Sequence, residues 1–128
     1  MFANTKATNG FAVDDIEAAK RFYGETLGLG VKTLSEEFGV VAIELAGGRD
    51  TVVYAKPDFA PATYTILNFE VDDVDGAVEQ LAERGVETER YEGFDQDDKG
   101  IARSPGPAIA WFKDPAGNIL AVMQQASA

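Results

Sequence analysis

The sequence predicts an α+β fold in which a βαβββ unit is used twice in tandem. The prediction rests on a near-repeat: residues 11–16 read Phe-Ala-Val-Asp-Asp-Ile, and residues 69–74 read Phe-Glu-Val-Asp-Asp-Val. In both copies apolar residues alternate up to the acidic pair, and apolar residues at helical spacing follow it. A carboxylate at this change of period is a helix N-cap, so each copy is a strand that runs into a helix. Each copy opens one half of the chain, which makes the repeat a module of the fold.

The first module is predicted to span residues 7–55. Its first strand leads to Asp14 or Asp15, one of which caps a helix that runs to about Leu27 and stops at Gly28. Three strands follow this helix, and a glycine-rich turn joins the last two. The predicted strands are residues 7–13, 31–36, 39–45 and 51–55.

A linker at residues 56–63 contains two prolines and cannot continue a sheet. The second module, residues 64–124, repeats the plan, so residues 1–128 form a single domain of two modules. Its predicted strands are residues 64–71, 86–91, an extended stretch at 101–112 and 119–124. The predicted helix is residues 73–84, with an acidic loop at 92–100 and a tight turn at 114–118.

Strand alternation assigns a helix-facing side and a far side to each sheet. Phe11 and Val13 are expected to face the first helix. In the second module the expected helix-facing residues are Leu67, Phe69, Val71, Phe112, Leu120 and Val122. The expected far-face residues are Ile66, Asn68, Glu70, Ile109, Trp111, Ala121 and Met123. A mixture of small, polar and aromatic residues is typical of a ligand cup, and also of a solvated sheet face.

Composition limits the available chemistry. Among the 128 residues there is neither histidine nor cysteine. Histidine is the commonest general base and metal ligand, and cysteine is the thiol nucleophile and disulfide former. Disulfides, thiol catalysis and the usual histidine-based metal sites are therefore excluded.

The chain is strongly acidic, with a formal net charge of −11. This charge repels nucleic acid and attracts cations, although it also serves solubility alone. No apolar run is long enough to span a membrane, and residues 1–6 are too few and too polar for a signal peptide. We expect a cytoplasmic protein that binds neither nucleic acid nor a membrane.

Two groups of acidic residues are candidates for a functional site, one for acid–base catalysis and one for calcium binding. Glu44, Asn68 and Glu70 fall on the far face, where two carboxylates in unequal environments would allow acid–base chemistry. Glutamates near strand ends usually reach solvent, which favours a non-catalytic role. The second group lies in the predicted loop and lacks the spacing of an EF-hand, so a solvated acidic loop is favoured over a calcium site. Its members are Glu92, Asp95, Asp97 and Asp98.

Taken together and in order, these motifs resemble the glyoxalase/bleomycin-resistance/extradiol-dioxygenase family, the vicinal oxygen chelate superfamily. The resemblance covers about residues 7–124 and implies paired βαβββ modules whose sheets curl around a cavity, often completed by dimerisation. It rests on the strand that ends at Asp14-Asp15-Ile16, on residues 21–29 (Arg-Phe-Tyr-Gly-Glu-Thr-Leu-Gly-Leu), on residues 69–75 (Phe-Glu-Val-Asp-Asp-Val-Asp) and on residues 111–118 (Trp-Phe-Lys-Asp-Pro-Ala-Gly-Asn).

Enzymes of this superfamily bind a divalent metal through His and Glu residues on the first and last strands of each module, and the metal polarises substrate oxygens. Carried over by motif, the first-strand positions are Thr8 and Ile66, and the last-strand position of the second module is Ala121. The remaining position falls near Val53 or Tyr54. None of these residues is a usual metal ligand, so we expect neither a metal site nor another cofactor.

The cavity positions that the resemblance implies are rich in aromatic residues. Aromatic rings hold flat or cationic ligands by stacking and cation–π contacts worth about 0.5 to 2 kcal/mol each. For Trp111, a dimer contact and ordinary packing remain open alternatives. The predicted cavity residues are Trp111, Tyr54, Tyr64, Asn68, Glu44, Glu70, Ile109, Tyr91, Phe94 and Met123.

The chain thus resembles the bleomycin-resistance-like branch, whose members sequester a cationic antibiotic at a dimer interface. We predict a metal-independent, homodimeric protein that binds a cationic or aromatic small molecule, with antibiotic sequestration as the implied role. Two alternatives stay open. One is a glyoxalase-like lyase or dioxygenase, and the other is a non-catalytic interaction or regulatory module whose cavity is vestigial.

Overall fold

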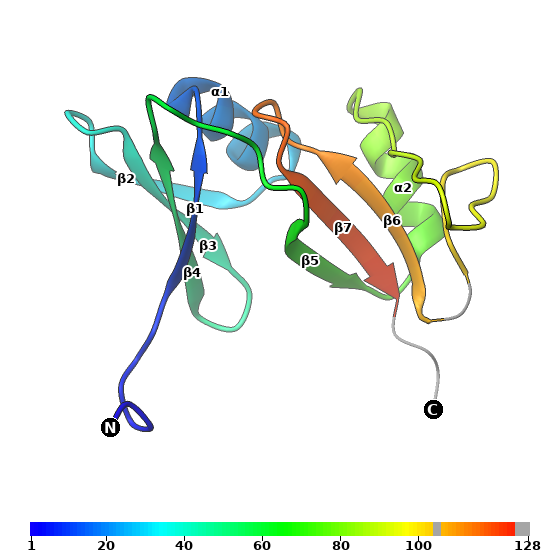
Figure 1. The fold of residues 1–128 in the computed structure, drawn as a ribbon, viewed down its shortest axis with the longest axis horizontal. Helices are drawn as coiled ribbons and strands as arrows, with labels where there is room; N and C mark the ends of the chain where they lie inside the picture. The colour runs from blue at the N-terminus through cyan, green and yellow to red at the C-terminus, as the bar shows by residue number, and fades with distance from the viewer. Residues whose placement is uncertain (104–105, 125–128) are drawn as a thin grey trace. The chain divides into compact units, whose positions relative to one another are not determined.

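The computed structural model describes residues 1–103 and 106–124, and the chain divides into two compact units. Unit 1 spans Met1–Pro61 and unit 2 spans Ala62–Ala128. Each unit combines one mixed β-sheet with one helical segment (Figure 1). The predicted α+β fold is confirmed. No helix within the described residues is long and apolar enough to cross a membrane.

Unit 1 contains a four-stranded sheet in the order β1-β4-β3-β2. Strand β1 is parallel to β4, whereas the β2–β3 and β3–β4 pairs are antiparallel. Helix α1 contacts β3 and β4, and the π-helix η1 contacts β2. The elements are β1 (Asn9–Val13), α1 (Ile16–Arg21), η1 (Phe22–Thr26), β2 (Gly30–Ser35), β3 (Val40–Leu45) and β4 (Arg49–Ala55).

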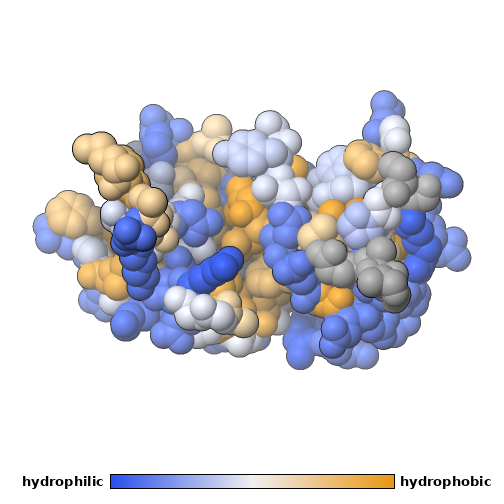
Figure 2. Space-filling view, turned by 90° about the horizontal axis from the view of Figure 1, so that it is seen from below, coloured by the Kyte–Doolittle hydropathy of each residue, from blue (hydrophilic) through white to orange (hydrophobic). Residues whose placement is uncertain are grey.

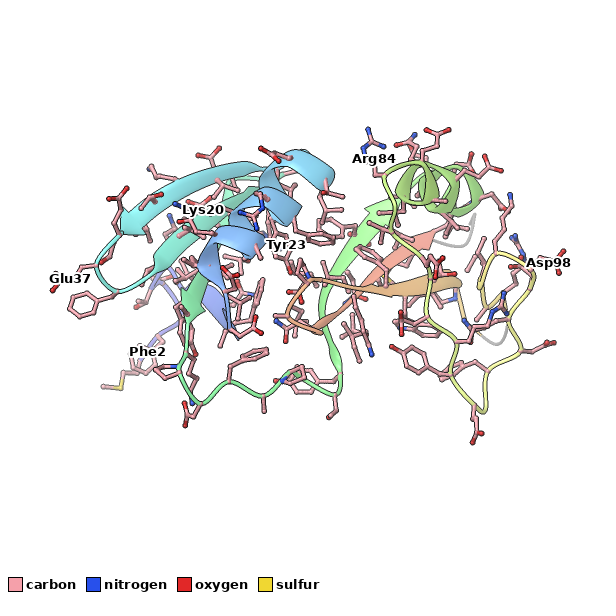
Figure 3. The ribbon with its side chains drawn as sticks, turned by 90° about the horizontal axis from the view of Figure 1, so that it is seen from above. Phe2, Lys20, Tyr23, Glu37, Arg84 and Asp98 are labelled. Atoms are coloured by element: carbon pink, nitrogen blue, oxygen red, sulfur yellow. The ribbon has the colours of Figure 1, made fainter. Side chains whose placement is uncertain are left out.

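The helix of unit 1 differs from the single α-helix that the sequence predicts. Of the two candidate caps, Asp15 is the one used, because its carboxylate accepts the amides of Glu17 and Ala18 at 3.0 and 3.1 Å. The last turn is a π-helix, and its wider turn places two consecutive aromatic residues in the core. Phe22 and Tyr23 are 8% and 1% exposed and meet edge to face, with ring centroids 5.2 Å apart. Figure 3 shows Tyr23 pointing from this segment toward the strands of unit 1, where its ring lies 5.7 Å from that of Phe11.

Unit 2 contains a three-stranded sheet in the order β5-β7-β6, with β5 parallel and β6 antiparallel to the central β7. Its helix α2 contacts β6 and β7 and buries Val74, Val78 and Leu81, which lie on one side of the helix. The elements are β5 (Thr65–Val71), α2 (Val74–Glu83), β6 (Ala108–Lys113) and β7 (Ile119–Gln124).

The predicted strand at residues 86–91 is wrong. Only Glu89 pairs with the sheet, through a single bridge in which its amide donates to the Trp111 carbonyl at 2.7 Å. The next ladder groups are taken by a side chain: Gln96 accepts the Tyr91 amide at 2.9 Å and donates to the Glu89 carbonyl at 2.9 Å. The sheet therefore has three strands instead of four.

The predicted extended stretch at residues 101–112 is also shorter in the structure. Strand β6 begins at Ala108, and before it Ala102 forms isolated bridges to Gln96 and Ile109. Residues 104–105 of this stretch lie outside the described residues.

The turn between β6 and β7 is built on a buried carboxylate. Asp114 accepts the amides of Ala116 and Asn118 at 3.0 and 2.9 Å, and its second oxygen accepts the Asn118 side-chain amide at 3.2 Å. The side-chain oxygen Oδ1 of Asn118 in turn accepts the Ala62 backbone amide at 3.2 Å, which fixes the start of unit 2 to this turn. The Asp-Pro-Ala-Gly-Asn motif is thus a structural device.

Candidate functional site

The strand register of unit 2 confirms the two predicted faces of its sheet. Trp111 and Asn68 both lie opposite Ala121 across the central strand. Residues directly opposite each other in a sheet share a face, so these three side chains lie on the side away from Phe112 and Leu120. By the same reasoning Ile109, Met123 and Glu70 share the far face.

A loop of unit 2 folds over this face at Trp111. The Tyr91 ring meets the indole edge to face at a centroid distance of 5.5 Å, and the Phe94 ring lies 4.9 Å from it. Ala102 and Ala121 are buried in the same cluster, with Ile109 packed against it. Trp111 is consequently only 9% exposed, whereas Phe94 remains 49% exposed. We call Tyr91, Phe94 and Trp111 the aromatic cluster.

Gln96 fixes the loop that carries Tyr91 and Phe94. Besides its two bonds to the backbone of residues 89 and 91, its side-chain amide donates to the Gly100 carbonyl at 2.7 Å. A single side chain therefore ties together the backbone of residues 89, 91 and 100. Sequence reasoning missed Gln96, because a lone glutamine between acidic residues gives no signal that it will replace a strand ladder.

Asp97 holds the far end of the same loop. Its carboxylate accepts the amides of Lys99 and Ile101 at 2.9 Å each and pairs with Arg103, whose guanidinium also bonds Asp75 at 2.8 Å. Burial acts to raise the pKa of the Asp97 carboxyl, but the bonds from Ile101, Arg103 and Lys99 outweigh it and hold the pKa below its usual range.

The acidic residues of this loop do not assemble into a metal site within the described part of the chain. The other three, Glu92, Asp95 and Asp98, are exposed, and Figure 3 shows Asp98 at the outer edge of unit 2. Because the chain has neither His nor Cys, Asp and Glu are the only charged metal ligands it could offer. Within the described ranges, no group of three or more of these side chains is placed to hold a metal ion.

The Tyr91 hydroxyl is a buried polar group without a hydrogen-bond partner among the described residues. Burial, and secondarily the negative charge of Glu89, raise the pKa of this phenol above its ordinary value. A desolvated hydroxyl gains stability from any polar group brought to it.

The other predicted cavity residues are not part of this cluster. Tyr64 is 70% exposed, and Asn68 and Glu70 are exposed along β5, all in unit 2. Tyr54 and Glu44 belong to unit 1, where Tyr54 is 40% exposed and Glu44 is exposed on β3. A cavity that combines residues of both units stays a prediction.

The positions where the superfamily places metal ligands carry unsuitable side chains. Thr8 is exposed just before β1, Ile66 is a half-buried residue of β5, and Ala121 is fully buried on β7. In unit 1 the remaining position falls on the fully buried Val53 or on Tyr54. The alkyl side chains of Ile66, Ala121 and Val53 donate no electron pair to a metal. The hydroxyls of Thr8 and Tyr54 are not among its usual His and carboxylate ligands, and the chain has no histidine to substitute. These residues do not fit the superfamily's metal.

Comparisons with known proteins agree with this architecture. The model of the Glyoxalase/Bleomycin resistance protein/Dioxygenase superfamily matches residues 7–122. A glyoxalase family protein from Enterococcus faecalis has a TM-score of 0.66 at 23% identity, covering 96% of this chain and 99% of its own. FosX, a fosfomycin resistance protein from Listeria monocytogenes, has a TM-score of 0.69 at 14% identity, with coverage of 96% and 94%. Both show the fold alone.

TnmS3, an antibiotic binding protein from Streptomyces sp. CB03234, has a TM-score of 0.66 at 26% identity and covers 96% of this chain and 98% of its own. The comparison with curated protein sequences finds no match. Because the family model spans most of the chain, the conclusion on family is direct. The chain belongs to the glyoxalase/bleomycin-resistance/dioxygenase superfamily.

Proposed function

We propose that this chain is a small-molecule-binding protein that holds its ligand without a metal ion and without reacting with it. The observation that supports this most strongly is the set of side chains at Thr8, Ile66 and Ala121, where the superfamily's metal chemistry requires His or Glu. A protein without this Lewis acid retains the binding surface of the fold but lacks the group that polarises substrate oxygens.

The aromatic cluster supplies a binding surface of suitable chemistry. Phe94 presents about half of its surface to solvent above the buried Trp111, and an aromatic ligand that stacks on such a ring gains about 0.5 to 1.5 kcal/mol beyond its buried area. The net charge of −11 favours cationic over anionic ligands at long range. We infer that flat, cationic or neutral aromatic compounds are the ligand class of this surface.

Antibiotic sequestration is the biological role we propose for this binding. Its support is the similarity to TnmS3, whose name describes it as antibiotic binding. Stoichiometric capture needs affinity alone, which agrees with a site that lacks catalytic groups.

A second candidate is an interaction module whose cavity is vestigial. It is favoured by one observation: Tyr91 and Phe94 already cover Trp111, so this part of the face is filled by the protein's own side chains. The two candidates differ in whether any small molecule reaches the cluster.

The test is a titration of Trp111 emission in EDTA-treated protein, because Trp111 is the only tryptophan of the chain. Metal-free bleomycin, benzamidine and benzyl alcohol serve as ligands, each at low and moderate salt. We expect a saturable change that EDTA does not remove and that Phe94→Ala weakens. Phe38→Ala, which removes a 72% exposed ring in unit 1, is the control and leaves the titration unchanged.

A change that requires added Zn²⁺ or Mn²⁺ contradicts metal-independent binding. No change with any compound contradicts ligand binding at the cluster and leaves the vestigial module as the better account. If moderate salt weakens the response to a cationic compound, charge contributes to its binding; if salt has no effect, stacking alone accounts for it.

A further inference from the structure

Unit 1 contains a pocket that none of the sequence motifs predicts. Its volume is about 630 Å³, within the range of roughly 300 to 1,000 Å³ typical of small-molecule sites. It lies between the segment that leads into β1 and the turn that joins β3 to β4, and Figure 1 shows both at the end of the unit 1 sheet remote from α1. The residues used below are Lys6, Ala7, Asn9, Leu45, Arg49 and Thr51.

The strand register places four residues of the pocket lining on the helix side of the sheet. Asn9 lies opposite Thr51, which lies opposite Ile43, and Leu45 lies opposite Arg49. Strand alternation puts Asn9, Thr51, Leu45 and Arg49 on the same face as Phe11, whose ring contacts Tyr23 of η1. Thr8 and Asp50, which alternation places on the other face, also belong to the lining, so the pocket lies at the end of the sheet and takes residues from both faces.

Unpaired positive charge is concentrated at this pocket. Of the eleven Lys and Arg residues, seven form an ion pair or donate a side-chain hydrogen bond to a backbone carbonyl among the described residues. The four without such a partner in the described part of the chain are Lys6, Arg21, Lys32 and Arg49. Two of these four line one pocket in a protein with a net charge of −11. Figure 2, seen from this end, shows strongly hydrophilic residues beside apolar ones on the surface.

The lining contains one carboxylate, that of Asp50. Asp50 lies opposite Glu44, and alternation places both on the face away from Arg49 and Thr51. Asp50 nevertheless lines the pocket, so the charged residues of the lining are two cations and one carboxylate.

A neutral donor is fixed at the same place. Thr51 is fully buried, and its hydroxyl donates to the Asn9 side-chain oxygen at 2.9 Å. With its oxygen accepting this bond, the Asn9 side chain presents its NH₂ group as a donor. Two cations and an amide donor line the pocket together with Ala7 and Leu45, a combination suited to an anion with a small apolar body.

We propose that this pocket is a second binding site of the chain, which takes a small organic anion such as a carboxylate, sulfonate or phosphonate. Lys6 and Arg49 neutralise the charged group, and Asn9, held by Thr51, donates a hydrogen bond to it. Ala7 and Leu45 contact the apolar part. The site lies wholly within unit 1 and is independent of the aromatic cluster.

The test follows backbone amide signals by NMR during titration with three compounds that share a phenyl ring: phenylphosphonate, benzyl alcohol and benzamidine. We expect phenylphosphonate alone to shift the signals of residues 6–9 and 48–51, whereas benzamidine and benzyl alcohol, the proposed ligands of the aromatic cluster, leave these signals unchanged. Replacing both Lys6→Ala and Arg49→Ala weakens phenylphosphonate binding by about tenfold or more, because hydrogen bonds to charged groups are lost. Higher salt weakens it as well.

The matched control is the double variant Arg21→Ala and Lys32→Ala. This control removes the same two positive charges as the pocket variant, but from exposed residues of unit 1 outside the pocket. If contacts within the pocket determine the affinity for phenylphosphonate, the control changes that affinity by no more than about twofold. Thr51→Val preserves the shape of the buried residue and frees the Asn9 amide to rotate. We therefore expect it to lose less affinity than the double variant Lys6→Ala and Arg49→Ala.

Three results overturn the proposal. The first is no shift at residues 6–9 and 48–51 with phenylphosphonate at about 10 mM, a concentration far above a useful affinity. The second is equal shifts at these same residues with benzyl alcohol and benzamidine, and the third is equal weakening of phenylphosphonate binding in the control variant. None of these readouts uses Trp111, so this proposal and metal-independent binding at the aromatic cluster fail or survive separately.

Discussion

At the scale of single residues, Asp114 shows how a motif of the superfamily acts through structure. Its side chain is 5% exposed and accepts hydrogen bonds that shape the β6–β7 turn. We expect Asp114→Ala to lower the free energy of unfolding by about 2 to 3 kcal/mol, because buried amides lose a charged acceptor. Urea denaturation measures this loss. Asp95→Ala, in an exposed position, should stay within about 0.5 kcal/mol, and an equal loss in both variants would show that the turn bonds contribute nothing.

At the scale of elements, the loop at residues 89–102 is predicted to respond to acid through Asp97. The pKa of this carboxyl is lowered in the folded protein: burial opposes the shift, but bonds from Ile101, Arg103 and Lys99 exceed it. The stabilisation is therefore present above the ordinary aspartate pKa of about 3.9 and is lost as pH falls through the lowered value. Trp111 emission should shift to longer wavelength in that range as Tyr91 and Phe94 leave it.

Asp97→Ala should produce the same emission shift at neutral pH, since the loop then lacks its carboxylate anchor. Asp98→Ala is the control, because this neighbouring side chain is exposed and points outward (Figure 3). Emission that is unchanged in Asp97→Ala, or changed equally in both variants, would mean that Asp97 does not hold the loop closed.

The elements also show what the sequence could and could not predict. The repeat and the alternation of apolar residues predicted every strand of unit 1, helix α2 and the bounds of β7, because local period and capping decide these elements. They failed at residues 86–91, where the Gln96 side chain takes the ladder hydrogen bonds, and at the last turn of the first helix, where two consecutive aromatics require a π-helix.

Of the candidate site, alternation placed Trp111, Ala121 and Asn68 on one face, and the register agrees. The covering of Trp111 by Tyr91 and Phe94 was not predictable, because it depends on the conformation of an irregular loop. The unit 1 pocket was missed because Lys6 and Arg49 are far apart in sequence, and the parallel pairing of β1 with β4 brings their segments to one pocket.

At the scale of the whole molecule, we predict a homodimer, in keeping with the cavities that dimerisation completes in this superfamily. Sedimentation equilibrium should give twice the chain mass of 13.7 kDa. If a ligand site is shared between two copies, ligand should also shift the equilibrium toward the dimer, since binding to one state favours that state. If the protein has the mass of one chain at all concentrations and still binds ligand to saturation, the whole site lies within a single copy.

The central claim is binding without metal and without reaction, and one measurement tests it most directly. Metal-free bleomycin is titrated calorimetrically into EDTA-treated protein and into protein supplied with Zn²⁺, and the bound compound is then released by denaturation and weighed by mass spectrometry. We predict the same affinity in both titrations and recovery of the compound with its mass unchanged. Binding that appears only with Zn²⁺, or a compound recovered with altered mass, would contradict the account and return the chain to the metal-dependent enzymes of its superfamily.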